Sequence, residues 1–228
     1  MRAVSRTRKG ARWPQRAAIG GTLLGVAWAA LRLPAVQRGD VRLGDAVRSR
    51  GSELTDGVVA ATTELGSLYG VAGAAAALAA SGRPAAAKDV LGVGALAWVV
   101  AQHSKTRVRR ARPYESEMVR RLVRPPTGSS FPSGHAAVGA AMMTVLADRT
   151  RGRRGAGLLH LAYVYVAASR VYVGVHYPTD VIGGVGLGML LGSLWRGPTG
   201  RAGRTLVDGA LRLARPRALR LRLADPAA

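Results

Sequence analysis

Charged residues are strongly segregated along this chain. Six apolar stretches of 13 to 24 residues alternate with short charged segments, and Glu64 is the only Asp, Glu, Lys or Arg inside them. The stretches cover residues 17–31, 57–80, 90–102, 135–147, 155–169 and 181–195. They lack the polar face of an amphipathic soluble helix, and flanking uncharged residues bring most of them close to the roughly 20 residues that a membrane-spanning helix needs. The pattern predicts an all-α protein, a bundle of six transmembrane helices.

Two residue types support a membrane location. Alanine and glycine dominate the apolar stretches, and small residues allow close helix packing in a bilayer. The four tryptophans all lie near the ends of stretches, as in the aromatic belts of membrane proteins; they are Trp13, Trp28, Trp98 and Trp195. Two alternatives remain open from the sequence. The chain could be a soluble protein with buried Ala-rich helices, or residues 17–31 could be a cleaved signal peptide.

The distribution of basic residues predicts the orientation in the membrane. With six spans, both termini lie on one side, which then carries 20 basic and four acidic residues against 14 and seven on the other. By the positive-inside rule, the side with the termini is cytoplasmic. The outer side is nearly balanced except for residues 103–124, which hold eight basic and two acidic residues. We therefore predict a basic cytoplasmic N-terminus (1–16), one membrane domain (17–197) and a basic cytoplasmic tail (198–228), which is either disordered or lies on an anionic leaflet.

Composition excludes several classes of protein. The formal net charge of +22 and the pI near 11.8 would by themselves suggest a nucleic-acid-binding protein. Segregation of the charges argues against that function, and one Phe and six Tyr make base-stacking platforms improbable. The absence of cysteine excludes disulfides, thiolate zinc sites and cysteine nucleophiles.

Three clusters of polar residues fall on the predicted outer side. The first is Lys105 followed after six residues by Arg112-Pro113, the second is the segment 132–135 (Pro-Ser-Gly-His), and the third runs from Ser169-Arg170 through His176 to Asp180. Pro178 favours a helix start, which places Asp180 in the first helical turn and His176 just before it. Asp180 can then accept a hydrogen bond from one imidazole nitrogen and leave the other free to attack. The alternative is an ordinary helix-capping aspartate beside an interfacial histidine.

The other two clusters supply an anion site. Ser133 and Gly134 are typical of a helix start, with His135 in the first turn, and free backbone N–H groups there bind anions; the alternative is a simple serine cap. Arg170 ends an uncharged stretch, where an ionisable residue indicates function unless it only reaches to the interface. Together the clusters suit a phosphoryl group: cations balance its charge, one histidine attacks, and the other protonates the leaving oxygen. No carboxylate cluster is present to hold a divalent metal, so we predict metal-independent transfer through a phosphohistidine, without a cofactor.

These motifs, in this order, resemble the signature of the type 2 phosphatidic acid phosphatase superfamily, which is related to vanadium haloperoxidases and bacterial acid phosphatases. The resemblance runs from Lys105 to Asp180, and residues 129–135 and 169–178 are closely similar to bacterial membrane members. It implies that His176 is the nucleophile, Asp180 its orienting partner and His135 the general acid and later the base. It implies that phosphate is bound by Lys105, Arg112, Ser133, Gly134 and Arg170.

The expected protein is an integral membrane phosphatase that hydrolyses a lipid phosphate or pyrophosphate on the outer side. Phosphatidic acid, phosphatidylglycerol phosphate and polyprenyl pyrophosphates are the candidates that the resemblance implies. The alternative is a non-catalytic basic membrane scaffold or a nucleic-acid-binding protein. No role follows from the sequence for Glu64, and His103 is expected to be structural. The other basic residues of 103–124, Arg110 among them, either attract an anionic headgroup or form a solvated loop.

Overall fold

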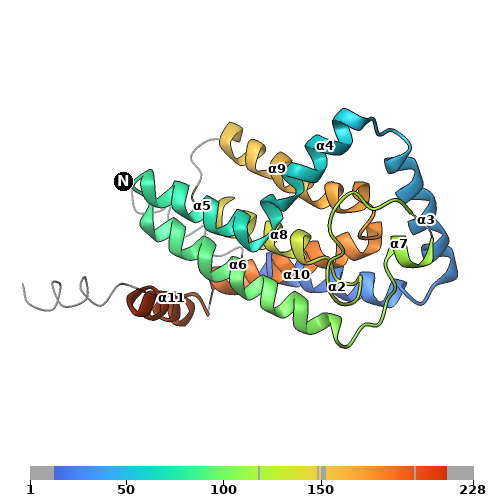
Figure 1. Ribbon diagram of the computed structural model, residues 1–228. Helices are drawn as coiled ribbons and strands as arrows, with labels where there is room; N and C mark the ends of the chain where they lie inside the picture. Colours follow the sequence, from blue (N-terminus) through green and yellow to red (C-terminus); the bar gives the residue numbers. More distant parts are fainter. Residues whose placement is uncertain (1–12, 118, 148, 150–152, 198, 215–228) are drawn as a thin grey trace, which may run out of the picture.

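The computed structural model describes residues 13–117, 119–147, 149, 153–197 and 199–214. This part of the chain is helical and contains no strand (Figure 1). The long helices are α2 (Trp13–Ala30), α3 (Pro34–Arg48), α5 (Leu68–Ala80), α6 (Pro84–Lys105), α8 (Gly134–Ala147), α9 (Arg153–Tyr172), α10 (Pro178–Arg196) and α11 (Gly200–Ala214). Shorter elements are α4 (Glu53–Thr62), the 3-10 helix η1 (Thr63–Gly66) and α7 (Pro113–Ser116). The all-α prediction is confirmed.

Five of the six apolar stretches coincide with single helices, namely α2, α6, α8, α9 and α10. The stretch 57–80 is instead divided into α4, η1 and α5. The side chain of Ser67 caps α5 by accepting hydrogen bonds from the N–H groups of Tyr69 (3.2 Å) and Gly70 (3.4 Å). The 3-10 turn before this cap carries Glu64, so the one charged residue of the apolar stretches lies at a break in the helix.

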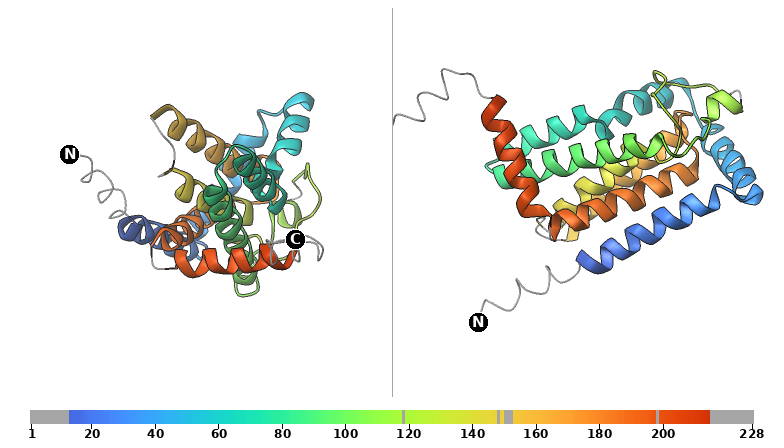
Figure 2. Two further views of the ribbon diagram at one scale, coloured as in Figure 1. Left: turned by 90° about the vertical axis from the view of Figure 1, so that its left-hand side faces the viewer. Right: turned by 90° about the horizontal axis from the view of Figure 1, so that it is seen from below.

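Helix α10 lies at the centre of the bundle, between α2 and α8 (Figure 2). Its glycines permit this close packing. A Cβ atom at Gly186 would lie 2.5 Å from the backbone of α2, and one at Gly188 would lie 2.2 Å from the carbonyl oxygen of Ala137 in α8. Larger side chains would force the helices apart, so the abundance of small residues serves helix contact, as predicted.

The two ends of the bundle are formed by different elements. Helix α11 lies across the end at which α2 begins, and α3, α7 and the segment 106–133 lie at the opposite end (Figure 2). Near α11, the buried carboxylate of Asp89 accepts hydrogen bonds from Trp195 Nε1 (2.9 Å) and Arg204 Nη1 (3.0 Å), and it also pairs with Arg149. A second ion pair joins Lys88 to Asp208 (2.5 Å). Part of the predicted tail is therefore a helix attached to α6, whereas residues 1–12 and 215–228 lie outside the described residues.

Length and composition of the described helices give limited support for membrane spans. Only α6 is by itself long and apolar enough to cross a bilayer. Helices α2 and α3 pass the same test as a pair but are bent by 102° at their junction. Helices α5 and α8 are apolar but shorter, with 13 and 14 residues. Six spans thus remain a prediction.

Candidate active site

The three sequence clusters come together at the end of the bundle opposite α11. Each residue sits at an element boundary: Lys105 ends α6, Arg112 precedes α7, His135 lies in the first turn of α8, Arg170 in the last turn of α9, and His176 just before α10. All are buried, as are Ser133, Gly134 and Asp180. Because burying three cations is unfavourable without compensation, this concentration of charge indicates a site built for an anion.

His176 and Asp180 form the predicted pair. Helix α10 begins at Pro178, and the Nδ1 atom of His176 lies 3.6 Å from Asp180 Oδ2. The same oxygen accepts hydrogen bonds from Ser130 Oγ (2.5 Å) and from the backbone N–H of Tyr177 (2.8 Å). Asp180 therefore caps the helix and also faces the histidine, so both interpretations of the sequence apply. A contact of 3.6 Å is longer than a hydrogen bond, as is common in unliganded catalytic sites.

The protonation of His176 suits a nucleophile. Its side chain is 2 % exposed, and this burial lowers the pKa of His176 to about 3, in spite of the nearby carboxylate of Asp180. The imidazole is therefore neutral near pH 7. With Nδ1 turned toward Asp180, the lone pair of Nε2 points away from this carboxylate and accepts a long hydrogen bond from Arg112 Nη1 (3.5 Å).

Arg112 holds the site together through backbone carbonyl groups. Its guanidinium donates hydrogen bonds to the carbonyl oxygens of Val175 (2.9 Å), Gly128 (3.1 Å), Thr127 (3.2 Å) and Ser129 (3.2 Å). These bonds join the segment before α8 to the turn that carries His176. The sequence predicted only that Arg112 binds phosphate. The structure adds a positioning role for Arg112, because most of its N–H groups already donate to carbonyl oxygens.

Arg170, Lys105 and the two histidines leave polar atoms without partners. Arg170 Nη1 donates to Thr63 Oγ1 (2.8 Å), but its Nε, His135 Nε2 and His176 Nδ1 are buried without a hydrogen bond. Lys105, 8 % exposed, makes no ion pair within the described part of the chain. Unpaired buried polar atoms call for an explanation. His135 Nε2 and His176 Nδ1 face the carboxylates of Glu64 and Asp180, each at 3.6 Å, whereas a bound anion would explain Arg170 Nε.

The start of α8 has the geometry expected of an anion site. Ser133 Oγ accepts a weak hydrogen bond from the N–H of Ala136 (3.4 Å), and the Ser133 N–H donates to the carbonyl oxygen of Asp180 (3.0 Å). The ring of Trp98 packs edge-on against His135, with centroids 6.0 Å apart. The first N–H groups of a helix have no acceptor within it, and those of α8 lie beside His135. No three His, Asp or Glu side chains of the described residues are grouped as metal ligands.

Glu64 is a site residue to which the sequence assigned no role. Its Oε1 atom lies 3.6 Å from His135 Nε2 and 4.0 Å from Arg170 Nη1. The available signal was its position as the only charge within an apolar stretch, which marks a functional residue. Its partners were not predictable, because they are 71 and 106 residues away along the chain.

Arg110 and Asp40 extend the His176–Asp180 pair. Arg110 donates from Nη1 to Asp180 Oδ1 (2.6 Å) and from Nη2 to Asp40 Oδ2 (2.6 Å), and it stacks over the ring of Tyr177 at 4.2 Å. Asp40 Oδ1 also accepts from the N–H and hydroxyl of Thr179 (2.9 and 2.7 Å). Burial would lower the pKa of Arg110, but the two carboxylates raise it above its ordinary value. Arg110 is therefore not part of a solvated basic loop.

Replacing Arg110 with glutamine should reduce turnover strongly, because Asp180 then loses a buried ion pair and no longer holds His176 in place. We expect kcat to fall by about 10- to 100-fold, the range seen when partners of site ligands are removed, with a smaller change in KM. Arg109→Gln, one residue away and exposed, is the matched control and should keep normal turnover. Equal kinetics for the two variants would contradict this role of Arg110.

The site and the fold define a helical protein with a histidine–aspartate pair and an anion pocket at one end of a bundle. The model of the PAP2 superfamily matches residues 86–199, half of the chain, and the protein belongs to this superfamily. The matched range contains all three motifs.

Characterised relatives are lipid phosphatases by name. The chain is 40 % identical over 114 residues to decaprenylphosphoryl-5-phosphoribose phosphatase from Mycolicibacterium smegmatis, covering 47 % of this chain and 61 % of the relative. It is 39 % identical over 95 residues to undecaprenyl-diphosphatase from Sulfolobus acidocaldarius, covering 41 % and 45 %. The chain thus spans about half the length of these relatives.

Two solved structures share the fold. A transmembrane PAP2-type phosphatidylglycerolphosphate phosphatase from Bacillus subtilis superposes with a TM-score of 0.62 at 22 % identity, covering 89 % of this chain and 98 % of the other. LpxE from Aquifex aeolicus gives a TM-score of 0.61 at 27 % identity, covering 68 % and 93 %. The similarity to transmembrane structures is compatible with six spans.

Proposed function

We propose that this protein is an integral membrane phosphatase that hydrolyses the phosphate or pyrophosphate of a lipid. The observation that carries the proposal is the meeting of His176, His135 and three buried cations around unpaired polar atoms. Family membership and the names of the relatives support the same class of reaction.

The proposed reaction has two steps at one phosphorus atom. His176 Nε2 attacks phosphorus, the bond to the lipid oxygen breaks, and His135 gives its proton to that oxygen. His135 then takes a proton from water, the water oxygen attacks phosphorus, and the bond from phosphorus to His176 breaks to release phosphate. Lys105 and Arg170, with the N–H groups at the start of α8, offset the negative charge of the transition state.

Two positioning pairs support these steps. Glu64 faces His135 Nε2 at 3.6 Å and orients its ring toward the leaving oxygen. Asp180, held by Arg110 and Ser130, orients His176. Each histidine thus has a carboxylate partner, and only that of His176 is part of the sequence motif.

The charge distribution supports one orientation. We propose that both termini are cytoplasmic and that the site faces the outer side, because the predicted inner side has 20 basic and four acidic residues. The ends of the described bundle fit this proposal, since Trp13 of α2 approaches Gly197 after α10 at the end opposite the site. The apolar chain of the lipid would remain among the helices while its phosphate enters the cationic pocket.

Phosphate release from a panel of lipid phosphates tests the proposed function. Detergent-purified protein should release phosphate from a polyprenyl pyrophosphate, a phosphatidic acid or a phosphatidylglycerol phosphate faster than from a soluble phosphate monoester. Activity should persist with excess chelator, and vanadate, which mimics five-coordinate phosphorus, should inhibit it. Absence of turnover on every lipid by membrane-bound protein would favour the non-catalytic scaffold, and DNA binding by a soluble protein would favour the nucleic-acid alternative.

A further inference from the structure

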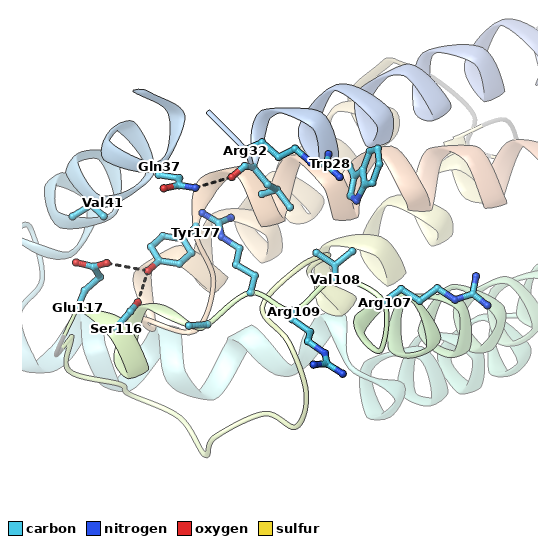
Figure 3. Close-up of a pocket in the computed structure, with 13 residues that line it drawn as sticks. Trp28, Arg32, Gln37, Val41, Arg107, Val108, Arg109, Ser116, Glu117 and Tyr177 are labelled. Carbon is cyan, nitrogen blue, oxygen red and sulfur yellow. Dashed lines mark hydrogen bonds between the residues drawn. The ribbon is translucent and has the colours of Figure 1, made fainter. Parts of the chain in front are cut away.

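A basic cavity lies behind the catalytic residues, on the far side of the segment 107–111. It has a volume of about 470 Å³ and lies between this segment and the corner where α2 meets α3. Figure 3 shows Trp28 and Arg32 on one wall and Val108 on the other, with Arg107 and Arg109 extending outward from the segment. Three arginines, Arg32, Arg107 and Arg109, are thus among the residues that line the cavity.

These three arginines are not neutralised by the protein. Arg32 stacks over the indole of Trp28 at 4.1 Å, and none of the three forms an ion pair within the described chain. Glu117, the one carboxylate of the lining, receives a hydrogen bond from the hydroxyl of Tyr177 (3.4 Å). Arg110 is paired with two aspartates. The unpaired Arg32, Arg107 and Arg109 therefore give the lining of the cavity a net positive charge.

An apolar groove continues from this cavity. The groove, about 510 Å³, shares Trp28, Arg107 and Val108 with it. It runs along α2 from Trp28 to Gly21, which is roughly 10 Å at the rise of an α-helix, and Phe131 and Leu190 line it as well. One elongated site thus combines a cationic head region with an apolar channel parallel to the helices.

This site is separate from the catalytic centre. None of the residues assigned to the chemistry lines the cavity or the groove: His135, His176, Asp180, Lys105, Arg112 and Arg170 are all absent from both linings. The ring of Tyr177 and the paired Arg110 form the wall between them. A molecule in the groove would therefore not present its phosphate to His176.

We infer that this cavity and groove bind an anionic diacyl phospholipid that is not the substrate. The unpaired arginines offer planar donor groups and positive charge to a phosphodiester, and the groove receives an acyl chain. Charge complementarity favours an anionic lipid over a zwitterionic one, and the adjoining apolar groove favours a lipid over a free phosphate. The site goes beyond the proposed hydrolysis, because a phosphodiester headgroup offers no terminal phosphate.

Thermal stability in neutral detergent micelles tests this inference. Adding phosphatidylserine, an anionic phosphodiester lipid that is not the product of any candidate substrate, should raise Tm by several degrees in a saturable manner, since a ligand that binds only the folded state stabilises it. Phosphatidylcholine should leave Tm unchanged. Inorganic phosphate and glycerol phosphate can occupy the catalytic pocket, so any shift that they cause should be the same in the unaltered protein and in the cavity and groove variants. The same shift should occur in the His176→Ala variant, which separates this result from any outcome for catalysis.

Two variants test whether the lipid that raises Tm binds in this cavity and groove. Gly25→Leu fills the groove, and a Cβ at Gly25 meets nothing within 4 Å, so helix packing is preserved. Arg107→Gln combined with Arg109→Gln removes the charge from the rim. Both should abolish the shift and retain turnover. Gly73→Leu in α5 is the matched control, because a Cβ at Gly73 also meets nothing within 4 Å. This variant should keep the Tm shift. An equal shift with phosphatidylcholine, or a phosphatidylserine shift that survives both variants, would overturn the inference.

Discussion

Replacing His176 with alanine is expected to abolish phosphate release from lipid phosphates. His176 is the proposed nucleophile because burial keeps its imidazole neutral and its Nδ1 side faces Asp180, which leaves Nε2 for the attack. Loss of a nucleophile that acts together with its partners lowers kcat by roughly 10⁴-fold or more. The measurement is the single-turnover rate of phosphate release by the purified variant. Elution of the variant at the same volume as the unaltered protein shows that it is folded.

His103→Ala is the matched control for this variant. His103 is exposed and lies two residues before Lys105 on α6, so its loss should leave the rate within a factor of two or so. A His176→Ala protein with unaltered turnover would overturn the mechanism, and equal losses in both variants would point to general damage of the fold.

Replacing Asp89 with alanine is expected to cause the largest loss of stability. Asp89 is fully buried and accepts hydrogen bonds from Trp195 in α10 and Arg204 in α11, besides its pair with Arg149. Removing one partner of a buried ion pair costs about 3 kcal/mol or more, so Tm should fall by roughly 6–12 °C. Thermal unfolding in detergent, followed by circular dichroism, measures this shift.

Asp208→Asn provides the comparison at the same interface. The Lys88–Asp208 pair also joins α11 to α6, but both side chains are more than one third exposed. A pair of this kind contributes about 1 kcal/mol or less, so Tm should change by only a few degrees. If the two variants had equal Tm values, the network around Asp89 would not anchor α11 as described.

Local sequence was sufficient to predict which residues meet at most of the candidate site. His176 and Asp180 are four residues apart around a proline, and Ser133, Gly134 and His135 are adjacent, so each cluster has its geometry set by one helix start. The order of the clusters between Lys105 and Asp180 then indicated the family. Arg112 was identified as well, but its bonds to four carbonyl groups depend on how two loops meet, which spacing alone does not show.

Contacts between distant segments account for what was missed. Glu64 meets His135 and Arg170, and Asp40 meets Arg110 and Thr179, across at least 70 residues of chain. No periodicity relates such positions. The break at η1 was missed for a different reason, because a local cap at Ser67 lies inside a stretch whose composition predicted one continuous helix.

The sequence by itself determined that this protein is helical and which segments are apolar, and it predicted which histidines carry the chemistry, because charge segregation and helix-start motifs are local properties. Tertiary structure alone decided that Glu64 faces His135, that Arg110 is a buried bridge between Asp40 and Asp180, and that Asp89 ties α11 to the bundle. These are pairings of buried charges, and a buried charge is stabilised only by the particular partner that packing brings within hydrogen-bond distance.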